Sequence, residues 1–173
     1  MIRKGIEQDI PHIAAIYEHI HDNEECGKST VGWIRGVYPT ADTARAALDT
    51  DDLFVMEEGG AVVAAARINR IQVPVYADVP WRYPDVPDEQ VMVLHTLVVD
   101  PNVKGKGYGT AFVAFYEQLA RETDRPYLRI DTNARNTPAR ALYKKLGYTE
   151  AGIVAGTFNG IPDVQLVCLE KKV

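Results

Sequence analysis

The sequence predicts a mixed α/β fold, in which one sheet of about seven strands carries helices on both faces. Runs rich in β-branched residues alternate with segments whose apolar residues recur at helical spacing. Their order is one strand, two helices, three strands, a helix, a strand, a helix and two strands, which is typical of a sheet covered by helices. With 173 residues, 46% of them hydrophobic and 25% charged, the chain fits a single globular domain over residues 1–173.

Capping residues mark the helices of the N-terminal part. Asp9 is expected to cap the first helix, with Pro11 in its first turn, and Thr40 or Asp42 is expected to cap the second. A Gly59-Gly60 turn predicts a hairpin after them. The elements expected here are a strand over residues 2–4, a helix from Ile10 that ends before Gly27, a helix through Leu48, and strands from Leu53 to Glu57 and from Ala61 to Asn69.

The segment from Ile71 to Glu89 is expected to be a long ordered loop. Its four prolines exclude a central strand or a helix interior. Long loops in compact domains are often functional, but the aromatic residues of this segment also suit a surface flap that covers a core edge. Both interpretations stand at this level.

Two helices and four strands are expected in the C-terminal part. Gly147 is expected to follow the end of the second helix, and Asn159-Gly160 to join the last two strands. An unpaired final strand would favour a homodimer. The elements are strands from Val91 to Val99, Pro126 to Asp131, Gly152 to Phe158 and Val164 to Glu170, a helix from the glycine loop to about Arg121, and a helix capped by Asn136 or Thr137.

A glycine-rich loop joins the strand that ends at Val99 to the next helix. Gly105, Gly107 and Gly109 let the backbone approach a ligand closely, and the helix adds its positive N-terminal end. The loop therefore predicts a phosphorylated cofactor. It lacks the Walker A pattern and is a poor dinucleotide-binding fingerprint. The alternative for an isolated glycine loop is a flexible turn.

A second motif narrows the choice of cofactor. The pattern Asn-x-x-Ala-x-x-x-Tyr-x-x-x-Gly-Tyr runs from Asn136 to Tyr148, and Lys104–Gly109 matches Gln/Arg-x-x-Gly-x-Gly/Ala with Lys104 in place of Gln or Arg. Together the motifs resemble the GNAT superfamily of acyl-CoA-dependent N-acetyltransferases. The resemblance is specific from about Val91 to Tyr148 and follows the element order of the whole chain. It implies the GNAT fold, with a mostly antiparallel sheet.

The resemblance implies that acetyl-CoA is the acetyl donor. The strand end at Leu97, Val98 and Val99 would pair its backbone with the pantetheine arm, and Asn136 would also bond that arm besides capping its helix. Lys145, Arg135 and Arg140 are further candidates for contact with the 3′-phosphate. The backbone amides expected at the pyrophosphate belong to Lys104, Gly105, Lys106, Gly107, Tyr108, Gly109 and Thr110.

The chemistry implied by the resemblance is direct transfer to an amine. Tyr143 would protonate the departing thiolate, although its place on an apolar stripe also suits a core aromatic. A backbone N–H near Leu97 or Val98 would stabilise the oxyanion. His95 and Glu89 are the candidate bases. Each has a structural alternative, a hydrogen-bonded strand histidine and a solvated carboxylate.

Composition excludes several other classes of protein. A net charge of -5 argues against general nucleic-acid binding, and the longest apolar run is too short to span a membrane. The start of the chain does not resemble a signal peptide, and Cys26 and Cys168 are expected to be reduced, which favours a cytoplasmic protein. No metal is expected, because His12, His19 and His21 lack a metal-binding spacing and are assigned to the surface.

The acceptor is expected to be an amine of a small molecule or a peptide. Aromatic and acidic residues would surround it and favour a cation. The alternative functions are a non-catalytic acyl-CoA-binding module and a nucleotide-binding enzyme. The residues expected around the acceptor are Tyr17, Trp33, Tyr38, Tyr76, Trp81, Tyr83, Asp78, Asp85 and Asp88.

Overall fold

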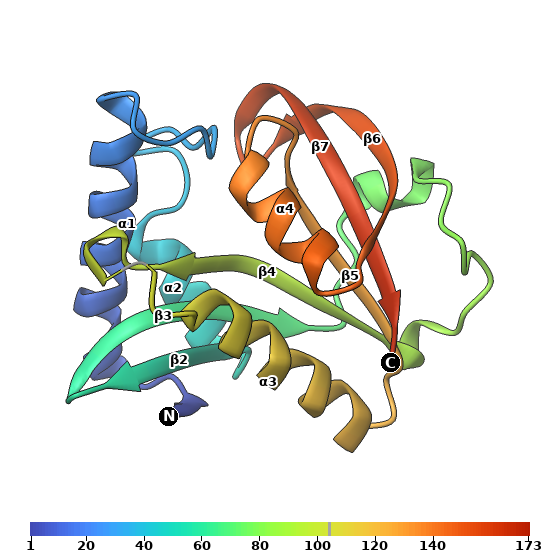
Figure 1. Cartoon of the computed structure of the whole chain (residues 1–173), viewed down its shortest axis with the longest axis horizontal. Helices are drawn as coiled ribbons and strands as arrows, with labels where there is room; N and C mark the ends of the chain where they lie inside the picture. The colour runs from blue at the N-terminus through green and yellow to red at the C-terminus, as the bar shows by residue number, and fades with distance from the viewer. Residues whose placement is uncertain (104) are drawn as a thin grey trace.

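A computed structural model describes residues 1–103 and 105–173 (Figure 1). Their strands form one sheet in the order β1-β2-β3-β4-β5-β7-β6, in which only β4 and β5 run parallel. The predicted fold, a mixed and mostly antiparallel sheet of about seven strands, is confirmed. The strands are β1 (Ile2–Lys4), β2 (Leu53–Glu58), β3 (Ala61–Asn69), β4 (Val91–Val99), β5 (Tyr127–Asn133), β6 (Thr149–Phe158) and β7 (Ile161–Lys172).

Four α-helices in the described residues cover both faces of the sheet, as expected. They are α1 (Ile10–Glu25), α2 (Ala41–Asp49), α3 (Tyr108–Glu122) and α4 (Thr137–Lys145). Because side chains alternate along a strand, Ala64 packs toward α3 while its neighbour Ala65 packs toward α1 and α2. In Figure 1, α3 and α4 lie on the near face of the sheet.

The helix ends agree with the sequence in all but one case. Thr40 is the N-cap residue of α2, where its amide donates to Thr43 Oγ1. The Asn136 side chain accepts a hydrogen bond from the amide of Ala139, and Gly147 follows α4 with a φ of +87°. The expectation for Asp9 is wrong in its chemistry, because the Asp9 carboxylate makes no capping bond to α1. It accepts instead from the amide of Ile6 and from Arg3.

The last two strands differ from the sequence expectation in length and position. Both are longer than expected, and they meet at the Asn159-Gly160 turn. The final strand, β7, lies between β5 and β6 and pairs with both, so it is not the unpaired final strand that would favour a homodimer. The outer strand on this side of the sheet is β6.

The segment from Ile71 to Glu89 is the flap over a core edge that the sequence allowed. It contains only the short 3-10 turns Pro74–Asp78 and the start of Asp88–Gln90. Tyr76, Val79 and Trp81 are buried against residues of β4 and β7. Its position therefore leaves the opposite end of β4 free to form a site.

Candidate functional site

The parallel strands β4 and β5 separate halfway along their length. They pair only from Val91 with Tyr127 to Leu94 with Ile130, although β4 continues to Val99 and β5 to Asn133. Among the described strands, β3 alone pairs with the backbone of β4 beyond Leu94. Main-chain donors and acceptors on one side of β4 are thus available to a ligand.

A bulge shapes β4 where the two strands separate. His95 pairs with Arg67 and Val98 with Ala65, so Thr96 and Leu97 together lie opposite Ala66. Thr96 has a φ of +52°, a conformation that favours glycine. Its hydroxyl shares a hydrogen bond with the hydroxyl of Tyr38. The bulge redirects the backbone at the expected oxyanion position. No residue type in the sequence predicts this bulge.

The space between the separated strands is a cavity of about 580 Å³. Thr96–Val99 of β4 and residues 131–133 of β5 form two of its walls. The start of α4, the loop 27–33 and the turn after β6 form the others. This volume is typical of a site for a small-molecule ligand.

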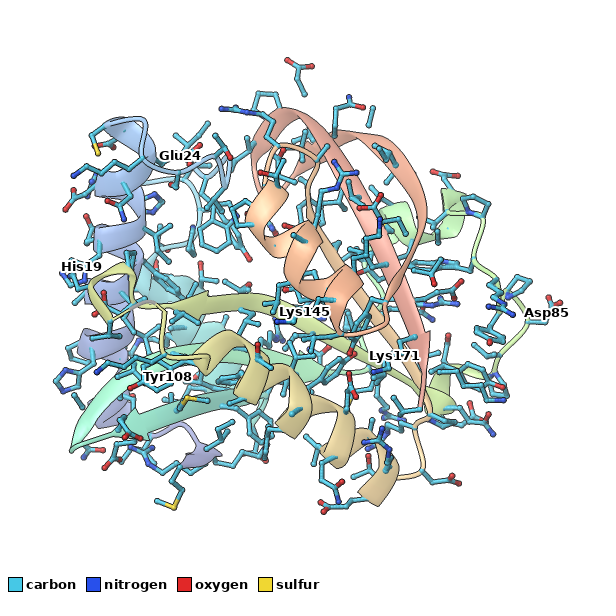
Figure 2. All side chains as sticks on the ribbon, viewed as in Figure 1. His19, Glu24, Asp85, Tyr108, Lys145 and Lys171 are labelled. Atoms are coloured by element: carbon cyan, nitrogen blue, oxygen red, sulfur yellow. The ribbon has the colours of Figure 1, made fainter. Side chains whose placement is uncertain are left out.

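The glycine loop lies next to this cavity without lining it. Gly105 and Gly107 have φ values of +87° and +79°, and Gly107 precedes the first turn of α3. A Cβ at Gly109 would lie 3.3 Å from Leu142 Cδ2, so Gly109 lets α3 approach α4 closely. Lys106 is exposed, Tyr108 opens α3 as Figure 2 shows, and Thr110 is exposed in its first turn. The expected role of Lys104 falls outside the described residues.

Tyr143 and Asn136 both line the cavity, together with Leu97, Val98 and Val99. The Tyr143 hydroxyl makes no hydrogen bond within the described part of the chain, and burial raises the pKa of this phenol. A phenol in this position stays protonated at neutral pH and can act as a donor. Asn136 also donates to Thr132 Oγ1 at 3.2 Å, which holds the start of α4 against β5.

A second cavity of about 160 Å³ lies beside the first and contains His95. His95 Nε2 lies 2.9 Å from Asn69 Oδ1, an oxygen that already accepts from the amide of Ile71, so Nε2 carries the proton. Burial, with Arg67 nearby, lowers the pKa of His95 to about 4. His95 is therefore neutral at pH 7 and a weak base.

Glu89 lies away from both cavities. It is an exposed residue just before β4, at the opposite end of the strand from Leu97 to Val99. A nine-residue strand is roughly 30 Å long, which exceeds the reach of a side chain. The structure does not bring Glu89 together with Tyr143.

The loop after α1 covers one side of the main cavity. Both carboxylate oxygens of Glu24 accept bonds from it, from the amides of Val31 at 2.7 Å and Gly32 at 2.9 Å. Thr30 Oγ1 donates to the carbonyl of Arg135, across the cavity, at 2.7 Å. The Glu24 label in Figure 2 marks the end of α1 where this loop begins.

Asp131 is the site residue that the sequence missed. It lies in β5, lines both cavities, and accepts a hydrogen bond from the hydroxyl of Tyr76 at 2.7 Å. Burial raises the pKa of its carboxyl to about 6. The sequence does not indicate this position, because an aspartate at the end of a strand, just before a polar turn, gives no sign that it lines a cavity.

The expected aromatic and acidic surroundings of the acceptor are only partly present. Tyr17, Trp33 and Tyr38 line one or both cavities. The other aromatic residues belong to the flap, where Tyr76 reaches the site only through Asp131. Asp85 lies on the side of the molecule opposite Glu24 (Figure 2). The flap residues Asp78, Trp81, Tyr83, Asp85 and Asp88 do not line either cavity.

The remaining expectations concern basic residues and histidines. The guanidinium of Arg140 is bonded to Glu150 and to the carbonyl of Ala134, while Arg135 and Lys145 are exposed. His21 is buried, with Nε2 3.0 Å from the carbonyl of Pro39, so its assignment to the surface is wrong. The packing of α1 against the residues before α2 buries this face of the helix.

His12 is exposed, and His19 is half-exposed beside Asp100 at the outer side of α1 (Figure 2). Within residues 1–103 and 105–173, no group of three His, Cys, Asp or Glu side chains is placed to hold a metal ion. None of the helices described is long and apolar enough to cross a membrane.

Comparison with known families gives one match that covers most of the chain. The model of the Acetyltransferase (GNAT) family matches residues 13–148. A curated relative, an uncharacterized N-acetyltransferase from Methanocaldococcus jannaschii, is 29% identical over 108 residues. That match covers 62% of this chain and 43% of the relative, so the chain spans less than half the length of that protein.

Solved structures share the fold at low sequence identity. A GNAT family acetyltransferase from Streptococcus agalactiae has a TM-score of 0.82 and 20% identity, with 100% of this chain and 95% of that chain covered. A ribosomal-protein-alanine N-acetyltransferase from Brucella melitensis has a TM-score of 0.72 and 22% identity, covering 100% and 99%. The yncA protein of Salmonella typhimurium, solved with its cofactor acetyl-CoA, has a TM-score of 0.70 and 18% identity, covering 99% and 92%.

Proposed function

Because the chain belongs to the GNAT acetyltransferase family, we propose that it transfers an acetyl group from acetyl-CoA directly to a primary amine of a small molecule or peptide. The separation of β4 from β5 carries this proposal. It leaves a cavity whose wall is an unpaired stretch of strand backbone, and a linear amide-containing arm can pair with such a stretch.

The donor end of the site is formed mainly by backbone. Leu97 to Val99 would bond the pantetheine arm, and the amides of the glycine loop at the start of α3 would bond the pyrophosphate. The fit is supported by the left-handed conformations of Gly105 and Gly107, beside which a Cβ would meet only open space. Acetyl-CoA would supply an activated acetyl thioester there.

The catalytic groups act on the two sides of the acetyl carbon. The Tyr143 hydroxyl donates a proton at the sulfur of the leaving group. Its position in the cavity, with no hydrogen-bond partner among the described residues, supports this role. The backbone N–H groups near the bulge at Leu97 and Val98 stabilise negative charge on the carbonyl oxygen. Of the two candidate bases, His95 lines the second cavity, whereas Glu89 has no role in the proposal because it lies outside both cavities.

The test is release of thiol from acetyl-CoA across a panel of polyamines, amino acids, aminoglycosides and short peptides. A Tyr143→Phe variant should bind acetyl-CoA with unchanged affinity, and its kcat should fall about 100-fold because the general acid is lost. Tyr83→Phe is the matched control, since Tyr83 packs against Tyr127 and is absent from the lining of both cavities.

An unchanged kcat in Tyr143→Phe would contradict the acid role of this residue. Binding of acetyl-CoA without turnover of any amine in the panel would favour the alternative, a non-catalytic acyl-CoA-binding module. Calorimetry with acetyl-CoA, ATP and NAD checks the donor independently, and a preference for ATP or NAD would contradict the proposal.

A further inference from the structure

We propose that Asp131 binds the acceptor as a small ammonium ion and takes one of its protons, so that the substrates are small cationic primary amines. This inference rests on the proposed acetyl transfer and names the acceptor class for it. It concerns a residue of β5 that lines both cavities.

Asp131 offers one carboxylate oxygen to a ligand. Oδ2 accepts from the Tyr76 hydroxyl at 2.7 Å, whereas Oδ1 accepts no hydrogen bond from the residues that the structure describes. A carboxylate removed from bulk water is costly unless a donor or a cation satisfies it. The side chain keeps solvent access only partly, and it lines the cavities. An incoming ammonium group would supply both the missing donor and the positive charge.

The surroundings of Asp131 suit a cation. Among the described residues that line the two cavities, Asp131 is the only acidic one. Tyr38 and Phe158 line both cavities with it, and Trp33 packs against Tyr38 with ring centroids 5.7 Å apart. Aromatic rings beside a carboxylate attract an ammonium ion through their negative faces.

In the second cavity, positive charge near Asp131 is already neutralised, while Lys28 lines only the main cavity, from the loop after α1. Arg67 of the second cavity donates to Asp52 Oδ2 from Nε and Nη2, both at 3.1 Å. Burial keeps His95 uncharged at neutral pH by lowering its pKa to about 4. The negative charge of Asp131 therefore remains for a ligand.

The loop after α1 limits the size of the acceptor. Thr30 bonds the carbonyl of Arg135, and Gly32 lies so close to Asn133 that an added Cβ would be 2.3 Å from Asn133 Nδ2. A Cβ at Gly160 would lie 3.3 Å from Val37, so the same loop also meets the turn after β6. Because this loop makes contacts on both sides of the cavity, a small molecule is favoured as the acceptor over a segment of another protein.

The chemical step balances with these groups. One N–H proton of the ammonium passes to Asp131, and the freed lone pair forms the C–N bond to the acetyl carbon. The C–S bond breaks, and the sulfur takes its proton from Tyr143. The acylated nitrogen then loses its second proton to water, from which Tyr143 regains one. Asp131 releases its own proton to water, so one proton leaves for each amide and thiol formed.

A pair of isosteric acceptors separates this role from a structural one. n-Butylamine is an ammonium ion near neutral pH, whereas O-propylhydroxylamine, with an oxygen in place of one CH₂, is neutral there. In Asp131→Asn, kcat/KM should fall about 100-fold for n-butylamine and less than about tenfold for O-propylhydroxylamine, because only the ammonium loses a charge-assisted bond.

Two further variants control for structure. Asp124→Asn removes an exposed carboxylate just after α3, so kcat/KM should be unchanged for both acceptors. Tyr76→Phe removes the partner of Asp131 but keeps its charge, so the ratio of kcat/KM between the two acceptors should stay at the wild-type value. Equal losses for both acceptors in Asp131→Asn, or no loss for n-butylamine, would overturn the proposal.

A binding measurement distinguishes failure of this inference from failure of the proposed function. Titration of n-butylamine into the protein with CoA, followed by NMR, should show binding that Asp131→Asn weakens. Asp131-dependent binding without turnover of acetyl-CoA would contradict acetyl transfer and retain the ammonium site. Turnover without dependence on Asp131 would retain acetyl transfer and reject the ammonium site.

Discussion

At the scale of single residues, Asp131 is the proposed binding group for the acceptor, and its carboxylate is poorly solvated where it lies. Among the residues that the structure describes, its carboxylate has one hydrogen-bond partner, the hydroxyl of Tyr76. Burial raises the pKa of Asp131 to about 6, because the charged form is poorly solvated. An ammonium ligand would reverse this shift, because an adjacent positive charge favours the ionised carboxylate.

The first prediction concerns pH. For n-butylamine, kcat/KM of the wild-type protein should decline as the pH falls below about 6, since protonation of Asp131 removes the charge that binds the ammonium. Asp131→Asn should lack this acidic limb. Steady-state rates from pH 5 to 8 check it. The same limb in the variant would assign the titration to another group.

The titratable neighbours of Asp131 leave this pH range clear. Tyr38 projects from the loop after α1 and Cys168 from β7, and burial raises the pKa of each to about 12. Tyr76 and Tyr143, from the flap and from α4, also have raised pKa values because they are buried. His95 of β4 has a pKa of about 4.

At the scale of elements, the loop after α1 depends on one side chain for its conformation. Glu24 accepts from Ser29, Val31 and Gly32, and it stands at the last turn of α1. Arg35 ties the far part of the loop back to α1 through Glu18, Asp22 and Glu25. Removal of Glu24 should therefore loosen the cavity wall while Arg35 still holds the end of the loop.

The second prediction follows from this arrangement. Glu24→Ala should raise KM for the acceptor substrate about tenfold, because the amides of Val31 and Gly32 lose the carboxylate to which they donate. Hydrogen exchange at Val31 and Gly32 should quicken. Glu18→Ala is the control on the same helix, because Glu18 pairs with Arg35 alone among the described residues and Arg35 keeps its other two partners. Unchanged exchange at both amides would show that Glu24 does not order the loop.

The elements themselves were largely predictable from the sequence. β3 and β4 have the expected bounds, and the caps of α2 and α4 follow from Thr40 and Asn136, because these signals are local. The loop after α1 was not predictable, since its bonds run to a helix side chain and to a carbonyl more than a hundred residues away. The bulge at Thr96 was not predictable from the sequence either, because threonine has no preference for positive φ.

At the scale of the whole molecule, the site costs stability. A carboxyl whose pKa is about 6 in the folded protein and 3.8 in a model compound is disfavoured in its charged form on folding. Stability from this group is complete below the lower pKa and is lost as the pH rises through 6. The loss is roughly 3 kcal/mol at neutral pH, at about 1.4 kcal/mol for each unit of pKa shift.

The third prediction is that Asp131→Asn unfolds at a higher temperature than the wild type at neutral pH. The asparagine oxygen can still accept from Tyr76, and no charge has to be desolvated. The difference should shrink as the pH approaches 4, where the wild-type carboxyl is protonated in the folded state. Calorimetry of both proteins at the two pH values measures it. A less stable variant at neutral pH would mean that the carboxylate is satisfied by groups of the protein.

The separation of β4 from β5 also bears on aggregation. A strand with unpaired backbone groups on the outside of a sheet recruits strands of other molecules, and proteins usually protect such strands with charge, proline or bulges. The unpaired stretch of β4 faces inward, between β5, the start of α4 and the loop after α1. A second sheet has no access to it. A single extended chain can reach it. The fold therefore keeps a strand edge that can pair with a linear ligand and is closed to the strands of another molecule.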